Sequence, residues 1–100
     1  MNYGLWYDFR NPEQWRRPFD EFYSATLAQI RHAERLGFES IWLTEHHFCA
    51  DGYTPSPLVL SAAIGAATQE MRIGTNLMLL PLHDPVRLAE DAATLSLTTQ

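Results

Sequence analysis

Residues 37–48 read GFESIWLTEHHF, and this stretch decides the fold. Its centre, SIWLT at 40–44, is nearly apolar throughout, which is typical of a β-strand that is covered on both faces. Gly37 stands where the left-handed C-cap of a preceding helix belongs, and a glutamate and two histidines follow the strand directly. The stretch therefore predicts the end of a helix, a buried strand and a polar strand exit, in that order.

The same unit of strand and helix recurs along the whole chain. The predicted strands cover 3–7, 40–44 and 72–80, and the predicted helices cover about 20–36, 57–69 and 85–98. Asp20, Ser56 and Asp84 stand at helix N-cap positions, and a proline follows each of the last two. Each link between strands is long enough for a right-handed crossover, so we expect a parallel sheet.

This order, β-α-β-α-β-α, is that of an α/β protein. Apolar parallel strands need cover on both faces, which either a closed barrel or an open doubly wound sheet provides. Eight units of this length would take about 250 to 300 residues, the usual size of an eightfold (β/α) barrel. Three units leave at least one strand edge unpaired. We therefore interpret residues 1–100 as the incomplete N-terminal part of a larger protein.

Composition excludes several classes of function. The chain is 46% apolar and has a net charge of −5 with its histidines neutral, so it lacks the basic footprint of a protein that binds nucleic acid or an anionic membrane. A single cysteine, Cys49, cannot form an internal disulfide, which favours a reducing compartment. The sequence shows neither a signal peptide nor an apolar run of about 18 residues. These features predict a globular, cytoplasmic protein.

The exit of the second strand is the strongest candidate for a catalytic site. Glu45, His46 and His47 stand at its carboxyl end, where ligands and chemistry are found in parallel α/β folds. Histidine titrates near neutrality, and a neighbouring carboxylate can set its tautomer. Because side chains alternate along a strand, His46 shares a face with Trp42 and Thr44, and it should face the interior if the other face packs on the helices. A capping or core histidine that is satisfied by the backbone is the alternative.

The third strand carries a weaker signal. Gly74, Thr75 and Asn76 interrupt an apolar run with small and polar residues. Within a strand, glycine often marks a bulge or the close approach of a ligand, and a merely tolerated glycine gives the same pattern. Gly74 is therefore a candidate ligand contact with an ordinary structural alternative.

Competent metal ligands also stand near the strand exits: Glu45, His46, His47, Cys49, His83 and Asp84. The adjacent His46 and His47 would point to opposite sides of a continuing strand, and no HxxxH, CxxC or HxH spacing is present. An open-sheet metal-binding protein is thus an alternative, but we predict no metal site.

Two blocks of sequence carry a resemblance to a known family. WLTEHHF at 42–48 and PVRLAED at 85–91, with RIGTNL at 72–77 between them, resemble segments of the bacterial luciferase-like flavin-dependent monooxygenases. The resemblance runs over nearly the whole chain and implies the first three units of a (β/α)8 TIM barrel. It also implies a cofactor, reduced FMN or in some members a reduced deazaflavin coenzyme, which acts with molecular oxygen on a small organic substrate.

The resemblance assigns catalytic roles to the exit of the second strand. His46 matches the family's active-site histidine, which would act as a general base or as a hydrogen-bond donor to the substrate oxygen. His47 and Glu45 are its neighbours in the same block and complete the set of catalytic candidates.

The resemblance also assigns cofactor contacts to the third strand. The candidates match a bulge beneath the flavin ring: Gly74, Thr75, Asn76 and Leu77. In the family this segment often contains a non-proline cis peptide, which is expected here near the bond between Asn76 and Leu77. Together with Trp6, Trp42 and Met78, Leu77 would keep water away from the cofactor.

Partners follow from the resemblance as well. The second and third helices form the dimer interface in several relatives, so we expect a homodimer, with a flavin reductase as the supplier of reduced cofactor. The family's phosphate-binding groups come largely from later strands, and we therefore expect residues 1–100 alone to bind flavin weakly or not at all. Two other functions are alternatives: a deazaflavin-dependent hydride-transfer oxidoreductase on the same fold, and a non-catalytic, truncated interaction module.

Overall fold

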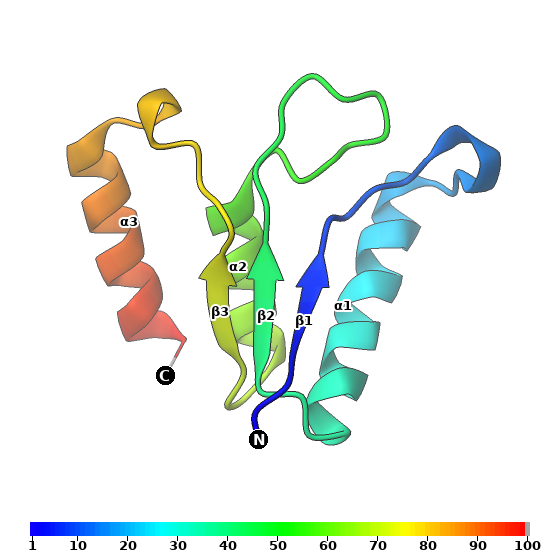
Figure 1. Ribbon diagram of the computed structural model, residues 1–100, viewed down its shortest axis with the longest axis horizontal. Helices are drawn as coiled ribbons and strands as arrows, with labels where there is room; N and C mark the ends of the chain where they lie inside the picture. The colour runs from blue at the N-terminus through cyan, green and yellow to red at the C-terminus, as the bar shows by residue number, and fades with distance from the viewer. Residues whose placement is uncertain (100) are drawn as a thin grey trace.

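A computed structural model describes residues 1–99 and shows three parallel strands side by side, each followed by a helix (Figure 1). The strands are β1 (Gly4–Tyr7), β2 (Ser40–Leu43) and β3 (Arg72–Thr75), and the helices are α1 (Phe19–Arg35), α2 (Pro57–Ala67) and α3 (Pro85–Thr98). Short 3-10 turns lie at Glu13–Trp15 and Leu80–Leu82. The predicted β-α-β-α-β-α order is confirmed. Within residues 1–99, no helix has the length and apolar character needed to cross a membrane.

The sheet places equivalent residues of the three strands at the same level. Its order is β1–β2–β3, and both pairings are parallel, as the long connections between the strands predicted. Trp6 is aligned with Trp42, and Trp42 with Gly74. Because side chains alternate along a strand, these three residues share one face of the sheet. All three strands end at the same edge, the upper one in Figure 1.

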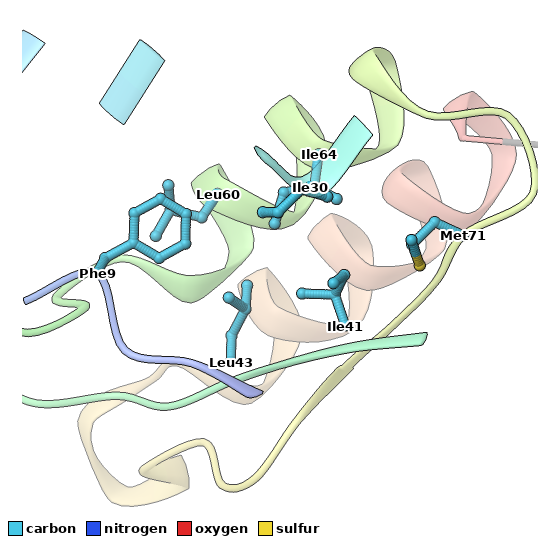
Figure 2. Packing of buried hydrophobic residues seen from close by; sticks show 7 residues of the cluster. All are labelled: Phe9, Ile30, Ile41, Leu43, Leu60, Ile64 and Met71. Carbon is cyan, nitrogen blue, oxygen red and sulfur yellow. The ribbon is translucent and has the colours of Figure 1, made fainter. Parts of the chain in front are cut away.

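The core lies between the sheet and the helices, on one face of the sheet only. Ile41 and Leu43 of β2 point into it and are fully buried, whereas Trp42 between them is 44% exposed on the opposite face. Figure 2 shows the buried cluster, which consists of Phe9, Ile30, Ile41, Leu43, Leu60, Ile64 and Met71. Complete burial of one isoleucine or leucine side chain contributes about 1.5–3 kcal/mol to the free energy of unfolding. Of the two faces expected to be covered, residues 1–99 cover one and leave the other open.

β3 is shorter than predicted. The apolar run indicated a strand over 72–80, but the strand ends at Thr75. The cause is its partner: β2 ends at Leu43, whose carbonyl oxygen accepts a hydrogen bond from the backbone N–H of Asn76 at 2.7 Å. Beyond this bond the backbone N–H of Leu79 donates to a side chain. The chain therefore leaves the sheet after Asn76.

The helix ends follow the sequence signals in part. Gly37 has a φ of 96° after α1, the left-handed conformation expected of a glycine at this position. At the start of α1 the prediction was wrong, because Pro18 occupies the N-cap and Asp20 lies in the first turn, where a carboxylate interacts favourably with the helix dipole. Asp84 caps α3 as predicted, whereas Ser56 makes no side-chain bond to α2.

The difference between the last two N-caps provides a matched pair of variants. The Asp84 carboxylate accepts hydrogen bonds from the backbone N–H groups of Val86 and Arg87, both at 3.0 Å. We expect Asp84→Ala to lower the free energy of unfolding by about 1 kcal/mol and Ser56→Ala to change it by less than about 0.5 kcal/mol. Urea denaturation of the intact protein measures both values. Equal losses would contradict the difference between the two caps.

Candidate active site

Three loops gather at the edge of the sheet where the strands end (Figure 1). They are the connections between β1 and α1, β2 and α2, and β3 and α3, which cover residues 8–18, 44–56 and 76–84. Since the strands are parallel, all of them lead into this edge, and residues far apart in the sequence become neighbours there. The predicted catalytic residues stand in the second of these loops.

A buried carboxylate joins two of the loops. Glu45, directly after β2, is 2% exposed and accepts hydrogen bonds from Nε2 of His47 at 2.8 Å and from Nε2 of His83 at 2.7 Å. A third hydrogen bond comes from the backbone N–H of Leu79 at 3.2 Å. An ionised carboxylate only accepts, so each imidazole carries a hydrogen on Nε2. Glu45 therefore orients His47 and fastens the exit of β2 to the segment before α3.

The ionisation of Glu45 reflects two opposing influences. Burial raises the pKa of the carboxyl group and is the largest single influence. The hydrogen bonds from His47, His83 and Leu79, with the charge of His83, lower the pKa and together outweigh burial. The pKa of Glu45 therefore lies below its ordinary value. At neutral pH the group is an anion, which suits it to orient the histidines and excludes it as a general acid.

His46 stands apart from this cluster. β2 ends at Leu43, so the strand alternation that predicted the orientation of His46 does not reach it. Its imidazole stacks on the ring of Tyr53, with 3.7 Å between the centroids and 6° between the planes, and its backbone N–H donates to the carbonyl oxygen of Thr54 at 3.1 Å. Among residues 1–99 no side chain is hydrogen bonded to this ring, in contrast to that of His47. Both nitrogens of the His46 ring are therefore free to contact a ligand.

The open face of the sheet carries an aromatic hollow. Trp6 is 63% exposed, and it borders a space of about 470 Å³ together with Trp42, Gly4, Leu5 and Asn76. The two indoles offer apolar contact to a planar ring, and the carboxamide of Asn76 can donate or accept hydrogen bonds at a polar ring edge. The isoalloxazine ring of a flavin combines a flat apolar surface with such an edge. The residues present therefore fit the cofactor that the sequence resemblance implies.

Gly74 is required for the position of Trp42. A Cβ atom built on Gly74 would lie 2.6 Å from Cζ3 and 2.8 Å from Cε3 of Trp42, closer than side-chain atoms approach. We expect Gly74→Ala to displace the indole and lower the free energy of unfolding by about 1–3 kcal/mol. In the Trp42→Ala background the same change should cost less than about 1 kcal/mol, because the clashing ring is gone. Urea denaturation of the wild type, the two single variants and the double variant measures these free energies of unfolding. Equal losses of stability from Gly74→Ala in both backgrounds would contradict the clash.

The structure separates the cofactor candidates of the third strand. Gly74 and Asn76 lie on the open face, whereas Thr75 lies on the side of the helices. There it lines a groove between β3, α2 and α3 together with Met78. Leu77 is 62% exposed, and the peptide bond before it is cis, as the resemblance implied. Two of the four candidates therefore share a surface with the tryptophans.

Sequence reasoning missed two residues that contact the catalytic candidates. The sequence identifies His83 only as a candidate metal ligand, yet His83 donates a hydrogen bond to Glu45. The position of His83 at the third strand exit, directly before an Asp-Pro helix start, could have indicated a place in the site. Tyr53 lies in a loop, and nothing in its spacing indicated the stack on His46. Within the described residues, no three His, Cys, Asp or Glu side chains form a group that could hold a metal ion.

Known proteins are similar in sequence to this chain. The profile of the family described as luciferase-like monooxygenase matches residues 1–100. The alkanal monooxygenase alpha chain of Photorhabdus laumondii is 41% identical over 61 residues, which are 61% of this chain and 17% of that protein. Limonene 1,2-monooxygenase of Rhodococcus erythropolis is 36% identical over 64 residues, 64% of this chain and 16% of that protein. The matched residues thus span about a sixth of the length of these curated relatives.

Two solved structures share the fold. The oxygenating constituent of 3,6-diketocamphane monooxygenase from Pseudomonas putida, solved in complex with FMN, matches 99% of this chain with a TM-score of 0.84 and 24% identity; the match covers 27% of that chain. A monooxygenase from Streptomyces bottropensis matches 99% of this chain with a TM-score of 0.86 and 27% identity, over 30% of its own length. These likenesses agree with the start of a barrel. Since the family profile spans every residue, the chain belongs to the luciferase-like monooxygenase family.

Proposed function

We propose that the protein to which this chain belongs is a flavin-dependent monooxygenase that uses reduced FMN and molecular oxygen to oxygenate a small organic substrate. The observation that carries the proposal is the aromatic hollow of Trp6, Trp42 and Asn76. Asn76 directly follows β3, at the same edge of the sheet at which His46 follows β2. Family membership supports it, as do relatives named alkanal monooxygenase and limonene monooxygenase, and a structural neighbour solved with FMN.

Residues of the open face would hold the cofactor. Reduced FMN supplies the electrons that activate oxygen, and the protein positions and shields its ring. Trp6 and Trp42 would contact the ring and exclude water, and the exposed Leu77, which directly follows Asn76, would add an apolar contact. Asn76 would hydrogen bond to the polar edge of the ring. Gly74 allows Trp42 to lie close to β3, in the position in which it borders the hollow.

His46 would act on the substrate. Its ring nitrogens make no hydrogen bond to a side chain of residues 1–99, so one of them can accept a proton from the substrate or donate a hydrogen bond to the substrate oxygen. Glu45 and His47 would form a second polar group at the same strand exit. The Glu45 carboxylate accepts from Nε2 of His47 and so leaves Nδ1 of His47 as an acceptor.

We further propose that residues 1–100 are the first three units of one (β/α)8 barrel, and that residues outside them hold the FMN phosphate. The structural neighbours support this, because each superimposes on nearly the whole chain with less than a third of its own length. The protein would be cytoplasmic, and a flavin reductase would supply its reduced cofactor.

The protein would be a homodimer joined through α2 and α3. Val59 of α2 and Val86 and Leu97 of α3 are exposed apolar side chains, which favours contact with another protein surface. We expect Val86→Glu to convert the dimer to a monomer, since the dimer would have to bury the new charge. Leu36→Glu is the matched control, because Leu36 is equally exposed and lies outside both helices. Light scattering after size exclusion measures the mass, and a wild-type monomer would contradict this part of the proposal.

Labelling with oxygen-18 tests the proposed reaction. The intact protein is mixed with light-reduced FMN, labelled oxygen gas and one of three substrates. These are decanal, limonene and a camphor-type ketone, chosen after the names of the relatives. We expect one labelled atom in the organic product and the other in water, with one FMN oxidised for each product. An unlabelled product formed only with a reduced deazaflavin would favour hydride transfer. No product from any of the three substrates, together with no binding of FMN, would overturn the proposal.

A further inference from the structure

His46 is one layer of a stack of three side chains. Its imidazole lies nearly parallel to the ring of Tyr53, at 3.7 Å between the centroids. Cζ of the Arg10 guanidinium lies 4.7 Å from the centroid of the same Tyr53 ring. One face of a six-membered ring has no room for both partners, so the guanidinium covers the face opposite His46. Tyr53 is therefore enclosed between an imidazole and a cation.

Asp51 holds Arg10 in this place. Nε of Arg10 donates to Oδ2 of Asp51 at 2.6 Å, and the backbone N–H of Asn11 donates to the carbonyl oxygen of Asp51 at 2.8 Å. The hydrogen bond from Arg10 holds the pKa of Asp51 below its ordinary value, so the pair is ionic at neutral pH. The loop after β1 is thereby fastened to the loop after β2, and the guanidinium is fixed over Tyr53.

The two neighbouring histidines are held in different ways. Glu45 holds His47 through a hydrogen bond, which occupies one ring nitrogen. The stack on Tyr53 orients His46 through the face of its ring, and no group of residues 1–99 is hydrogen bonded to either ring nitrogen. A histidine that exchanges a proton or a hydrogen bond with a substrate needs a fixed ring plane and a free nitrogen at the same time. Stacking provides both.

We propose that Tyr53 is a positioning residue for the reaction: it fixes the plane of the His46 imidazole, and Arg10, held by Asp51, fixes Tyr53 from the other side. This inference rests on the proposed function, in which His46 acts on the substrate. The contribution of Tyr53 comes from its ring and not from its hydroxyl group. Phenylalanine at position 53 should therefore preserve the orientation of His46, and an aliphatic residue should not.

Four variants of the intact protein test this role. Tyr53→Phe keeps the ring, Tyr53→Leu removes it, His46→Ala removes the proposed base, and Tyr3→Leu changes an exposed tyrosine at the opposite edge of the sheet as a control. With reduced FMN, oxygen and the substrate that the wild type oxygenates, we expect Tyr53→Leu to lower kcat about 10- to 100-fold and to change KM less than about twofold. Tyr53→Phe and Tyr3→Leu should stay within about twofold of the wild type.

A second readout reports the stack itself, without turnover. The ring protons of His46 in the NMR spectrum, assigned by their loss in His46→Ala, should lie upfield because of the ring current of Tyr53. They should stay upfield in Tyr53→Phe and return to the ordinary position in Tyr53→Leu. If Tyr53→Leu melts well below the wild type, Tyr53→Met takes its place, since methionine fills similar space without a ring.

The outcomes separate this inference from the proposed function. Loss of turnover in both His46→Ala and Tyr53→Leu, with turnover kept in Tyr53→Phe, supports the positioning role. Loss in His46→Ala alone, or ring protons that do not move in Tyr53→Leu, overturns the positioning role and leaves that of His46 intact. Full turnover in His46→Ala overturns the role of His46 in the proposed function, and the inference with it.

Discussion

Replacement of His46 by alanine is expected to lower the rate of product formation about 10²- to 10⁴-fold, the usual contribution of a positioned acid or base. His46 is exposed, and its ring is hydrogen bonded to no side chain of residues 1–99, so its loss leaves no buried polar partner unsatisfied. The protein should therefore stay folded, and the loss should report on chemistry and not on stability. The rate of oxygenated product with reduced FMN and oxygen measures the effect, and thermal unfolding confirms the fold.

His32→Ala is the matched control for this experiment. His32 is exposed in the last turn of α1, where it contacts Nη2 of Arg35 at 3.3 Å. That turn lies at the edge of the sheet opposite the strand ends (Figure 1). We expect turnover within about twofold of the wild type. A similar loss in both variants would point to general damage, and a full rate in His46→Ala would exclude His46 as the acid or base.

Glu45→Ala is expected to lower the free energy of unfolding by about 2–4 kcal/mol, the largest stability effect of any single change considered. The variant loses the acceptor of three hydrogen bonds, from His47, His83 and the backbone of Leu79. Water replaces this acceptor poorly, because the Glu45 side chain is buried. Glu45→Gln keeps the shape and one acceptor oxygen, so its loss should be smaller, about 1–2 kcal/mol. Urea denaturation of both variants measures these values, and a loss below about 1 kcal/mol in Glu45→Ala would contradict them.

The same carboxylate should make stability depend on pH. The pKa of Glu45 lies below its ordinary value of 4.5, so the unfolded chain takes up the proton at a higher pH than the folded protein does. The contribution of the ionised group is therefore present above pH 4.5 and is lost as the pH falls through the lower pKa of the folded state. We expect the stability difference between the wild type and Glu45→Gln to narrow in this acidic range. If the stability difference between the wild type and Glu45→Gln stayed the same at acidic pH, the lowered pKa of Glu45 would be contradicted.

Local signals allowed most of the fold to be predicted. Apolar runs and the helix starts at Ser-Pro and Asp-Pro located the strands and helices, and the left-handed Gly37 closes α1 as expected. The end of β3 could not be predicted in this way, because it depends on where β2 stops and not on the composition of 72–80. Ser56 resembles an N-cap in the sequence but makes no capping bond, since capping also depends on the direction from which the loop enters the helix.

The candidate site, too, could be predicted only in part. Parallel topology places every strand exit at one edge, so the position of Glu45, His46 and His47 near bound ligands is a prediction from order alone. The contact of Glu45 with His83 and the stack of His46 on Tyr53 each join residues whose approach is set by loop conformation. Loops have no repeating period, so the position of His83 at a strand exit indicated its neighbourhood but not its bond to Glu45, and nothing indicated the stack of His46 on Tyr53.

The two tryptophans of the open face also provide an intrinsic fluorescence signal for binding at the hollow. Of the three tryptophans in residues 1–100, Trp6 and Trp42 border the hollow, whereas Trp15 lies in the turn before α1 and is 76% exposed. Indole fluorescence responds to the immediate surroundings of the ring. A molecule that enters the hollow should change the emission of these two indoles, and Trp15, which lies outside the hollow, should respond less. Its arrival and departure can thus be followed in real time, without a label and before its identity is known.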